Sequence, residues 1–180
     1  MALSIRWLRL KDAPHIYAVE RSVFGANGWS AREFLRRFDS GTHNGVGVWV
    51  GDMLAGYLIA DARDTGIGVL ESVAVLQPVR RQGLATLMLE KLADSALCAA
   101  MGEWRARVHE ADVAAHHWLK SMGFACSHIE HRLDEPDYYH FVRPEPLPMK
   151  VKRASNKRSS KKCQRADSDN GESLAGAPAD

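Results

Sequence analysis

Apolar and polar residues alternate along several short stretches of the chain, and this pattern predicts seven β-strands. The expected strands cover residues 3–10, 46–50, 54–60, 67–75, 104–108, 124–129 and 138–142. A short turn that starts at Gly51-Asp52 separates the second strand from the third, so we expect these two to form a hairpin.

Apolar residues spaced three or four positions apart predict four helices between the strands. Their expected starts are the capping residues Asp12 and Ser30, the leucine Leu84, and the capping residue Asp112. Ser30 and Glu33 have the spacing of a capping box, and the helix from Leu84 is expected to continue unbroken towards Gly102.

The resulting order is β-α-α-β-β-β-α-β-α-β-β, which predicts an α/β fold in which helices pack on a central sheet. The 46% hydrophobic content of the 180 residues is sufficient for one domain with its own core. We therefore expect a single folded domain over residues 1–143.

The composition changes after Arg143. Residues 144–180 begin with three closely spaced prolines and then contain few bulky apolar side chains, so they are expected to form a disordered tail, first basic and then acidic. This tail carries eight basic and five acidic residues, a net charge of +3, whereas the whole chain has a net charge of +2. A basic tail of this kind is expected either to remain solvated or to make weak contacts with RNA or ribosomes.

Other features of the chain bear on its location. It contains no apolar run long enough to span a membrane, and its first residues do not form a secretory signal. Cys98, Cys126 and Cys163 are odd in number and far apart, which argues against a disulfide framework and against a zinc site. We expect a cytoplasmic protein without a metal.

The segment from Glu71 to Thr86 carries the most informative chemistry. A buried strand leads into a loop with Arg80, Arg81 and Gly83, and the loop leads directly into a helix. The first turn of a helix offers unpaired N–H groups and a partial positive charge, and the arginines add cationic hydrogen-bond donors. The pattern predicts a cradle for a phosphate or pyrophosphate, with an ordinary strand-to-helix connection as the alternative.

The sequence Arg80-Arg81-Gln82-Gly83-Leu84-Ala85 resembles the pyrophosphate-binding signature [RQ]-x-x-G-x-[GA] of the GNAT superfamily of N-acetyltransferases. The segment 115–124 is similar to a second signature of that superfamily, A-x-x-[FL]-Y-x-x-x-G-F, with Leu119 at the tyrosine position. Within the superfamily, residues 20–24, Trp29-Ser30 and Phe34 resemble the opening of bacterial ribosomal-protein alanine N-acetyltransferases.

This resemblance implies a mixed, mostly antiparallel sheet flanked by helices, and acetyl-CoA as co-substrate. It further implies that backbone groups of the strand at 73–75 hold the pantetheine and that the amides of residues 82–86 hold the pyrophosphate. The implied cofactor-binding residues are Val73, Val75, Arg80, Arg81, Gln82, Gly83, Leu84, Ala85, Thr86 and Asp112. Asp112 stands where many members have an asparagine, so it is expected to cap its helix whether or not it contacts the cofactor.

Acyl transfer requires that the attacking amine lose a proton and that the leaving thiolate be accommodated. The resemblance implies that Glu71 accepts the proton through water; the alternative is a solvated strand carboxylate. Leu119 cannot donate a proton, so Tyr139 is the expected donor. Its alternatives are Tyr138, His117, His140 and an unaided thiolate, and His109-Glu110 is a further possible acceptor-site pair.

The expected activity is therefore transfer of an acetyl group to a primary amine, with a protein N-terminus as the leading acceptor. A small-molecule amine, such as a polyamine, an amino sugar or an amino acid, is an alternative acceptor. A non-catalytic acyl-CoA-binding regulatory module is an alternative of another class. The protein is expected to be a monomer or a homodimer, and an exposed last strand would support the dimer.

Overall fold

The computed structural model describes residues 2–39, 43–62 and 66–147. Seven strands form one sheet in the order β1-β2-β3-β4-β5-β7-β6. The strands are β1 (Leu3–Trp7), β2 (His43–Val50), β3 (Met53–Ala62), β4 (Ile67–Val75), β5 (Glu103–His109), β6 (Ala125–Arg132) and β7 (Glu135–Arg143). The α-helices are α1 (Ala13–Phe24), α2 (Ala31–Asp39), α3 (Leu84–Ala93), α4 (Ala96–Ala99) and α5 (Val113–Ser121).

The sheet is antiparallel except at one seam. β4 and β5 pair in parallel over four residue pairs, from Ile67 with Glu103 to Leu70 with Ala106. A parallel connection needs a crossover, and α3 and α4 provide it. The seam joins a four-stranded half, β1 to β4, to a three-stranded half, β5, β7 and β6.

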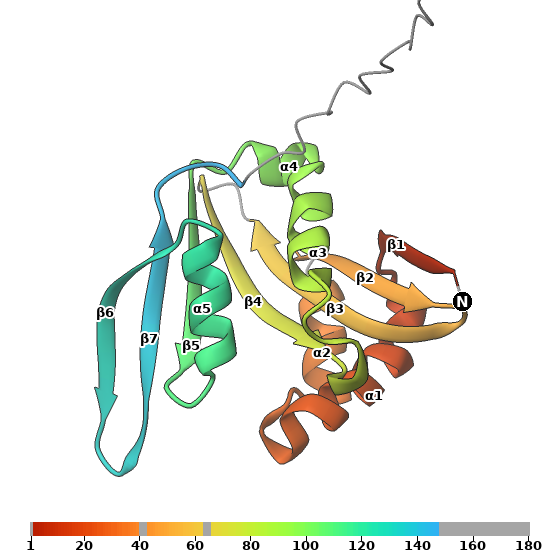
Figure 1. Cartoon of the computed structure of the whole chain (residues 1–180), viewed down its shortest axis with the longest axis horizontal. Coiled ribbons are helices and arrows are strands. Elements are labelled where there is room, and N and C mark those ends of the chain that lie inside the picture. Colours follow the sequence, from red (N-terminus) through yellow and green to blue (C-terminus); the bar gives the residue numbers. More distant parts are fainter. Residues whose placement is uncertain (1, 40–42, 63–65, 148–180) are drawn as a thin grey trace, which may run out of the picture.

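Helices cover both faces of the first half but one face of the second (Figure 1). One core cluster packs α1 and α2 against side chains such as Trp49, Tyr57 and Ile59, and the other packs α3 and α5 against Leu58, Trp104 and Phe141. Trp104 is fully buried. The hairpin of β6 and β7 extends beyond the helices, at the opposite edge of the sheet from β1 (Figure 1).

Two of the three predicted helix caps form as expected. Ser30 Oγ accepts a hydrogen bond from Glu33 N at 3.1 Å, and Asp112 Oδ1 accepts one from Ala115 N at 3.0 Å. Asp12 precedes α1 but makes no side-chain bond to it; its Oδ2 accepts the N–H of Arg9 at 2.9 Å instead. That bond fixes a 3₁₀ turn over Leu10–Asp12, so β1 ends at Trp7 rather than at residue 10.

The long helix expected between Leu84 and Gly102 is divided in two. The amides of Asp94 and Ser95 bond to carbonyls three residues earlier, and Ser95 adopts an extended conformation before α4 begins. Aspartate and serine compete for backbone hydrogen bonds and so favour helix ends. The observed order therefore contains α4 and three 3₁₀ helices in addition to the predicted elements.

The expected tail lies almost wholly outside the described residues, which end at Leu147. Leu147 itself is buried against the core, so ordered contacts extend past Arg143. In the described part of the chain, no helix combines the length and the apolar character that crossing a membrane requires.

Candidate active site

The candidate site lies where β4 and β5 separate. Their pairing ends at Leu70 and Ala106, although β4 continues to Val75 and β5 to His109 (Figure 1). On its other edge β4 stays paired with β3 up to Val75. The result is a V-shaped opening inside the sheet, bordered on one side by residues 73–75.

The backbone groups of Val73 and Val75 point into this opening. Leu76 N donates to Ala55 O at 2.9 Å, so in the alternating antiparallel pattern residues 74 and 76 bond to β3 and residues 73 and 75 face the other way. Arg80 Nε already donates to Val75 O at 2.8 Å. The N–H of Val75 and both backbone groups of Val73 are therefore the ones positioned to hold an extended amide chain such as pantetheine.

The predicted phosphate cradle adjoins the same opening. Arg81 and Gly83 both have positive φ, 64° and 74°, on either side of Gln82. Alternating backbone conformations of this kind turn successive N–H groups towards one concave point, and α3 adds the free amides of its first turn. A Cβ placed on Gly83 would meet no atom within 4 Å, so the positive φ, rather than crowding, makes glycine the favoured residue here.

The side chains that follow Gly83 have structural roles, which leaves the backbone of this segment to face a ligand. Leu84 is buried in the core, which leaves only its backbone to face a ligand. Thr86 Oγ1 accepts a hydrogen bond from Trp118 Nε1 at 3.2 Å, and this bond ties the start of α3 to α5. These residues fit a pyrophosphate through their amides, with Arg80 and Arg81 exposed beside them.

Glu71 lies at the apex of the opening because β4 contains a bulge there. Ile59 pairs with Ser72 and Ala60 pairs with Leu70, which leaves Glu71 as the extra residue. The bulge turns Glu71 and Ser72 to the same face, where Glu71 reaches α2 and Ser72 Oγ lies 3.0 Å from Tyr57 Oη. A bulge that redirects a side chain beside an opening in a sheet is a typical feature of an active site.

The side chains of Arg37 and His43 both contact the carboxylate of Glu71. Arg37 Nη1 is 2.6 Å from Glu71 Oε2, and His43 Nε2 is 3.0 Å from the same oxygen. The Glu71 side chain is 15% exposed and that of His43 is 3% exposed. Within the described residues, both of these contacts are made to Oε2.

Arg37 connects Glu71 to the α1–α2 loop. It also pairs with Glu33, one turn earlier, and its guanidinium stacks over the Trp29 ring at 4.3 Å. Desolvation alone would lower the pKa of Arg37, but its hydrogen bonds and ion pairs with Glu33 and Glu71 raise that pKa overall. The arginine is therefore a fixed positive charge beside Glu71.

Glu20 supports the same loop from beneath. It is 4% exposed, and its Oε1 accepts the N–H of Trp29 at 2.8 Å, whereas its Oε2 has no hydrogen-bond partner. Burial raises the pKa of Glu20; the Trp29 N–H opposes this effect and the charge of Glu33 adds to it. The cavity beside Glu20 has a volume of about 10 Å³, which admits one water at most.

His43, Asp61 and Glu71 place three potential metal ligands within 4.8 Å of one another. Arg37 lies against the same carboxylate at 2.6 Å, so a guanidinium supplies the positive charge at this point. A divalent cation there would be repelled by that guanidinium.

The expected proton donor is separated from Glu71 by the sheet. Tyr139 packs beside His116 of α5, with ring centroids 4.7 Å apart, whereas Glu71 faces α2. Tyr139 pairs with Val108, a β5 residue just beyond the end of the β4–β5 seam. Leu119, at the position of the expected tyrosine, is a core residue.

A model of the Acetyltransferase (GNAT) family matches residues 5–124. The chain belongs to the GNAT family. It is therefore an acetyltransferase that uses acetyl-CoA, and the family, the fold class and the co-substrate predicted from the sequence are confirmed.

Solved structures share the GNAT fold at low identity. The ribosomal-protein-S18-alanine N-acetyltransferase from Escherichia coli is 21% identical with a TM-score of 0.67, and the match covers 83% of this chain and 98% of that one. Ard1 from Thermoplasma volcanium is 18% identical with a TM-score of 0.69, covering 82% and 100%. PaiA N-acetyltransferase from Thermoplasma acidophilum, solved with coenzyme A, is 15% identical with a TM-score of 0.65, covering 80% and 99%. No curated protein sequence matches the chain.

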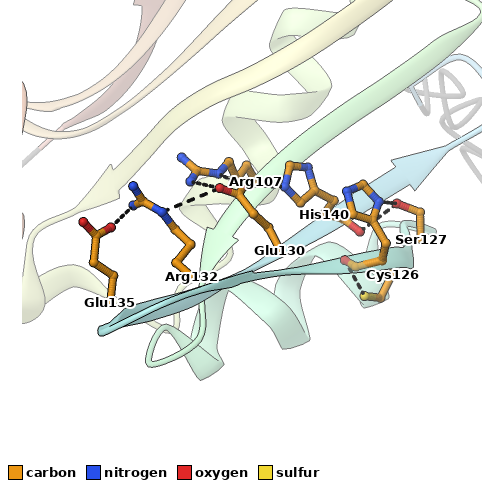
Figure 2. Close-up of polar contacts among 8 residues, drawn as sticks. Arg107, Cys126, Ser127, Glu130, Arg132, Glu135 and His140 are labelled. Carbon is orange, nitrogen blue, oxygen red and sulfur yellow. Dashed lines mark hydrogen bonds and ion pairs between the residues drawn. The ribbon is translucent and has the colours of Figure 1, made fainter.

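The remaining predicted side chains of this GNAT domain lie on its uncovered face or its surface. Tyr138 and His140 alternate along β7 with Tyr139 and so point away from α5, and His140 enters a row of polar contacts across β5, β7 and β6 (Figure 2). Arg107 binds Glu130 through two nitrogens, at 3.0 and 3.1 Å, and lies 3.6 Å from the Tyr138 ring. His117 is exposed on α5.

Glu130 is the centre of this polar row. It accepts from His140 Nε2 at 2.9 Å and from Arg107, and Arg132 also contacts it (Figure 2). The hydrogen bond from His140, followed by the one from Arg107, lowers the pKa of Glu130. His140 stacks on His128 at 4.2 Å, so His140 already has two partners on this face.

Sequence reasoning missed the residues that hold Glu71. Arg37 is 34 positions away along the chain and His43 is 28, and neither stands in a motif. The one available signal was the Glu33–Arg37 spacing of four on a predicted helix, which indicates a pair on one helix face but not its third partner.

Proposed function

We propose that this GNAT domain transfers the acetyl group of acetyl-CoA to a primary amine, with a protein N-terminus as acceptor. The observation that carries the proposal is the bulge at Glu71, which puts a carboxylate at the apex of the β4–β5 opening. Acetyl-CoA supplies the activated thioester. The residues of the chain must bind it, orient the amine and remove a proton.

In the proposed site, Val73 and Val75 hold the pantetheine with their backbone groups. The amides of residues 82–86, with the Arg80 and Arg81 side chains, hold the pyrophosphate. Asp112 is assigned to this set for its position; its observed contact is the cap of α5.

Glu71 is the proposed proton acceptor. A neutral amine is needed for attack, and a carboxylate linked through water can remove the proton. Arg37 and His43 both contact Oε2, which restricts the side chain. Tyr139 is the proposed proton donor to the leaving thiol, because it lies beside the end of the seam and Leu119 has no proton to donate.

A polypeptide end is the acceptor that we propose. The cavity beneath α1 and α2 is too small for an amino sugar or a polyamine. One structural neighbour carries a name that fits this class, the ribosomal-protein-S18-alanine N-acetyltransferase. A cytoplasmic location, a monomeric or homodimeric state, and RNA contact through residues 150–165, which lie outside the described residues, stay predictions.

The test is a comparison of wild type with Glu71→Gln. We expect kcat/KM for peptide acceptors to fall by about 10²-fold or more in the variant, because general-base catalysis contributes on that scale. Acetyl-CoA affinity, measured by calorimetry, should be unchanged because Glu71 is not assigned to the cofactor loop. A matching Arg81→Glu/Gly83→Asp variant should lose acetyl-CoA binding.

The acceptor is tested with the same assay on a panel of peptides, spermidine, glucosamine and free amino acids. A higher kcat/KM for peptides than for every small amine supports the proposal, and the reverse order contradicts it. Full activity of Glu71→Gln would show that this carboxylate is not the proton acceptor.

A further inference from the structure

A second polar site lies along the outer edge of β1, away from the β4–β5 opening. A groove of about 330 Å³ is lined by Ile5, Arg6, Trp7, Arg9, Lys11, Asp12 and Lys91, and we call it the β1 groove. Arg6 reaches Trp49 on the α1 face, whereas Trp7 packs with the core cluster on the α3 face. The groove therefore follows the free edge of the sheet and receives side chains from both faces.

The charge in the β1 groove is strongly positive. Four of its seven residues are cationic, and Asp12 is its one acid. Asp12 is buried, lies 4.0 Å from Arg6, and accepts the backbone N–H of Arg9, so it offsets one cation at most. Lys91 lies 3.6 Å from Asp94, which is outside the groove.

Arg9 and Lys11 are the cations most available to a ligand. Both are exposed, and neither side chain has an ion-pair partner within residues 2–39, 43–62 and 66–147. Trp7 adds a half-buried aromatic ring, with Lys91 Nζ 5.5 Å from its centre. Cations and an aromatic ring in an open groove are the combination that binds single-stranded nucleic acid.

The β1 groove is separate from the acetyl-CoA site. β1 is an edge strand, and three strands separate it from the β5 side of the opening. The two sites share α3, but the cradle is at its N-terminus and Lys91 is near its C-terminus, roughly 12 Å along the helix axis. Cations on an edge strand also prevent pairing with other chains, a role that needs no ligand.

We propose that the β1 groove binds the phosphate backbone of single-stranded RNA. Arginine forks and lysine ammonium groups match phosphate oxygens, and a phosphodiester chain presents one charge at each nucleotide along an open groove. Contacts to phosphate carry no sequence information, so the binding is independent of base sequence. This site is additional to acetyl transfer and does not depend on the proposed acceptor.

The experiment measures fluorescence anisotropy of labelled single-stranded RNA 20-mers with the full chain across a salt series. Arg9→Gln/Lys11→Gln should bind about tenfold more weakly at low salt, and its salt slope should fall by about 1.4, the loss expected for two phosphate contacts to a single strand. The matched control is Arg32→Gln/Arg36→Gln on α2, which removes the same charge from two exposed residues outside the groove.

The control variant should stay within about twofold of wild type, since its residues contact no phosphate in this proposal. Equal losses in the two variants, or none in the groove variant, would overturn the proposal, because the basic tail is intact in both. A labelled glutamate 20-mer is the second probe. Groove-dependent binding of that peptide as tight as RNA binding would overturn the assignment to nucleic acid.

Discussion

The two halves of the sheet differ in what surrounds them. β2 and β3 are buried along nearly their whole lengths between α1 and α2 on one face and α3 on the other. α5 covers one face of β7, β6 is exposed along nearly its whole length, and the face of the hairpin away from α5 carries a row of charged and histidine side chains (Figure 2). The first half is thus packed on both faces, and the second half is largely open to solvent.

This difference places the site at the boundary between the halves. β4 belongs to the buried half through its pairing with β3, and β5 belongs to the open half through its pairing with β7. The opening between them has one well-packed side and one accessible side. Such an arrangement can hold a cofactor in one position while an acceptor of variable size approaches.

Core truncation should expose the difference most strongly. Leu58→Ala in β3 removes a side chain that is 0% exposed, and we expect it to lower the free energy of unfolding by about 3 kcal/mol. Ile129→Ala in β6, where the side chain is 38% exposed, should cost less than about 1 kcal/mol. Urea denaturation of both variants measures the difference, and equal costs would contradict the division into halves.

Glu20→Gln should change stability by an intermediate amount and in a pH-dependent way. Burial raises the pKa of Glu20, so the folded state favours the protonated carboxyl group. The contribution of Glu20 to the free energy of unfolding is therefore fully present below the ordinary glutamate pKa and is lost as pH rises through the folded-state pKa. Glutamine cannot ionise, so at pH 7 we expect the variant to be more stable by about 1 kcal/mol. In thermal melts this is a gain of roughly 3 °C at pH 7 that disappears near pH 4. A variant that melts lower at both pH values would contradict this account.

Glu130→Gln in the open half should have the smallest effect. Hydrogen bonds from His140 and Arg107 lower the pKa of Glu130, so its contribution is present above the ordinary glutamate pKa and is lost as pH falls through the lowered value. Exposed pairs contribute little, and we expect Tm at pH 7 to change by no more than about 2 °C. If Glu130→Gln lowered the stability of the protein more than Ile129→Ala does, the polar row would be an important source of stability in this half of the sheet.

Local signals in the sequence predicted most of the fold. β4 has the predicted bounds of 67–75, and the caps at Ser30 and Asp112 form as expected, because each depends on residues within a few positions. The break at Ser95 was missed because no glycine or proline marks it. Nothing local identified the β-bulge, since a bulge is defined by the register with β3.

The candidate site was predictable for its backbone but not for its side-chain environment. The loop 80–86 is contiguous, so its turn and its helix start are visible in the sequence. The partners of Glu71 come from α2 and β2, and the face to which Tyr139 points depends on the register of β7 with β5. Such relations are set by the tertiary arrangement.

The short parallel seam also has a consequence for the order of assembly. β2, β3 and β4 pair in succession through short connections, as do β6 and β7, whereas the seam joins β4 and β5 across the α3–α4 crossover with only four residue pairs. Closing a long chain segment costs more entropy than closing a hairpin, so we expect the seam to form after the β2–β3–β4 meander and the β6–β7 hairpin. The opening in which we propose that acetyl-CoA binds would then be among the last parts of the molecule to be completed, and the co-substrate would stabilise late stages of folding in particular.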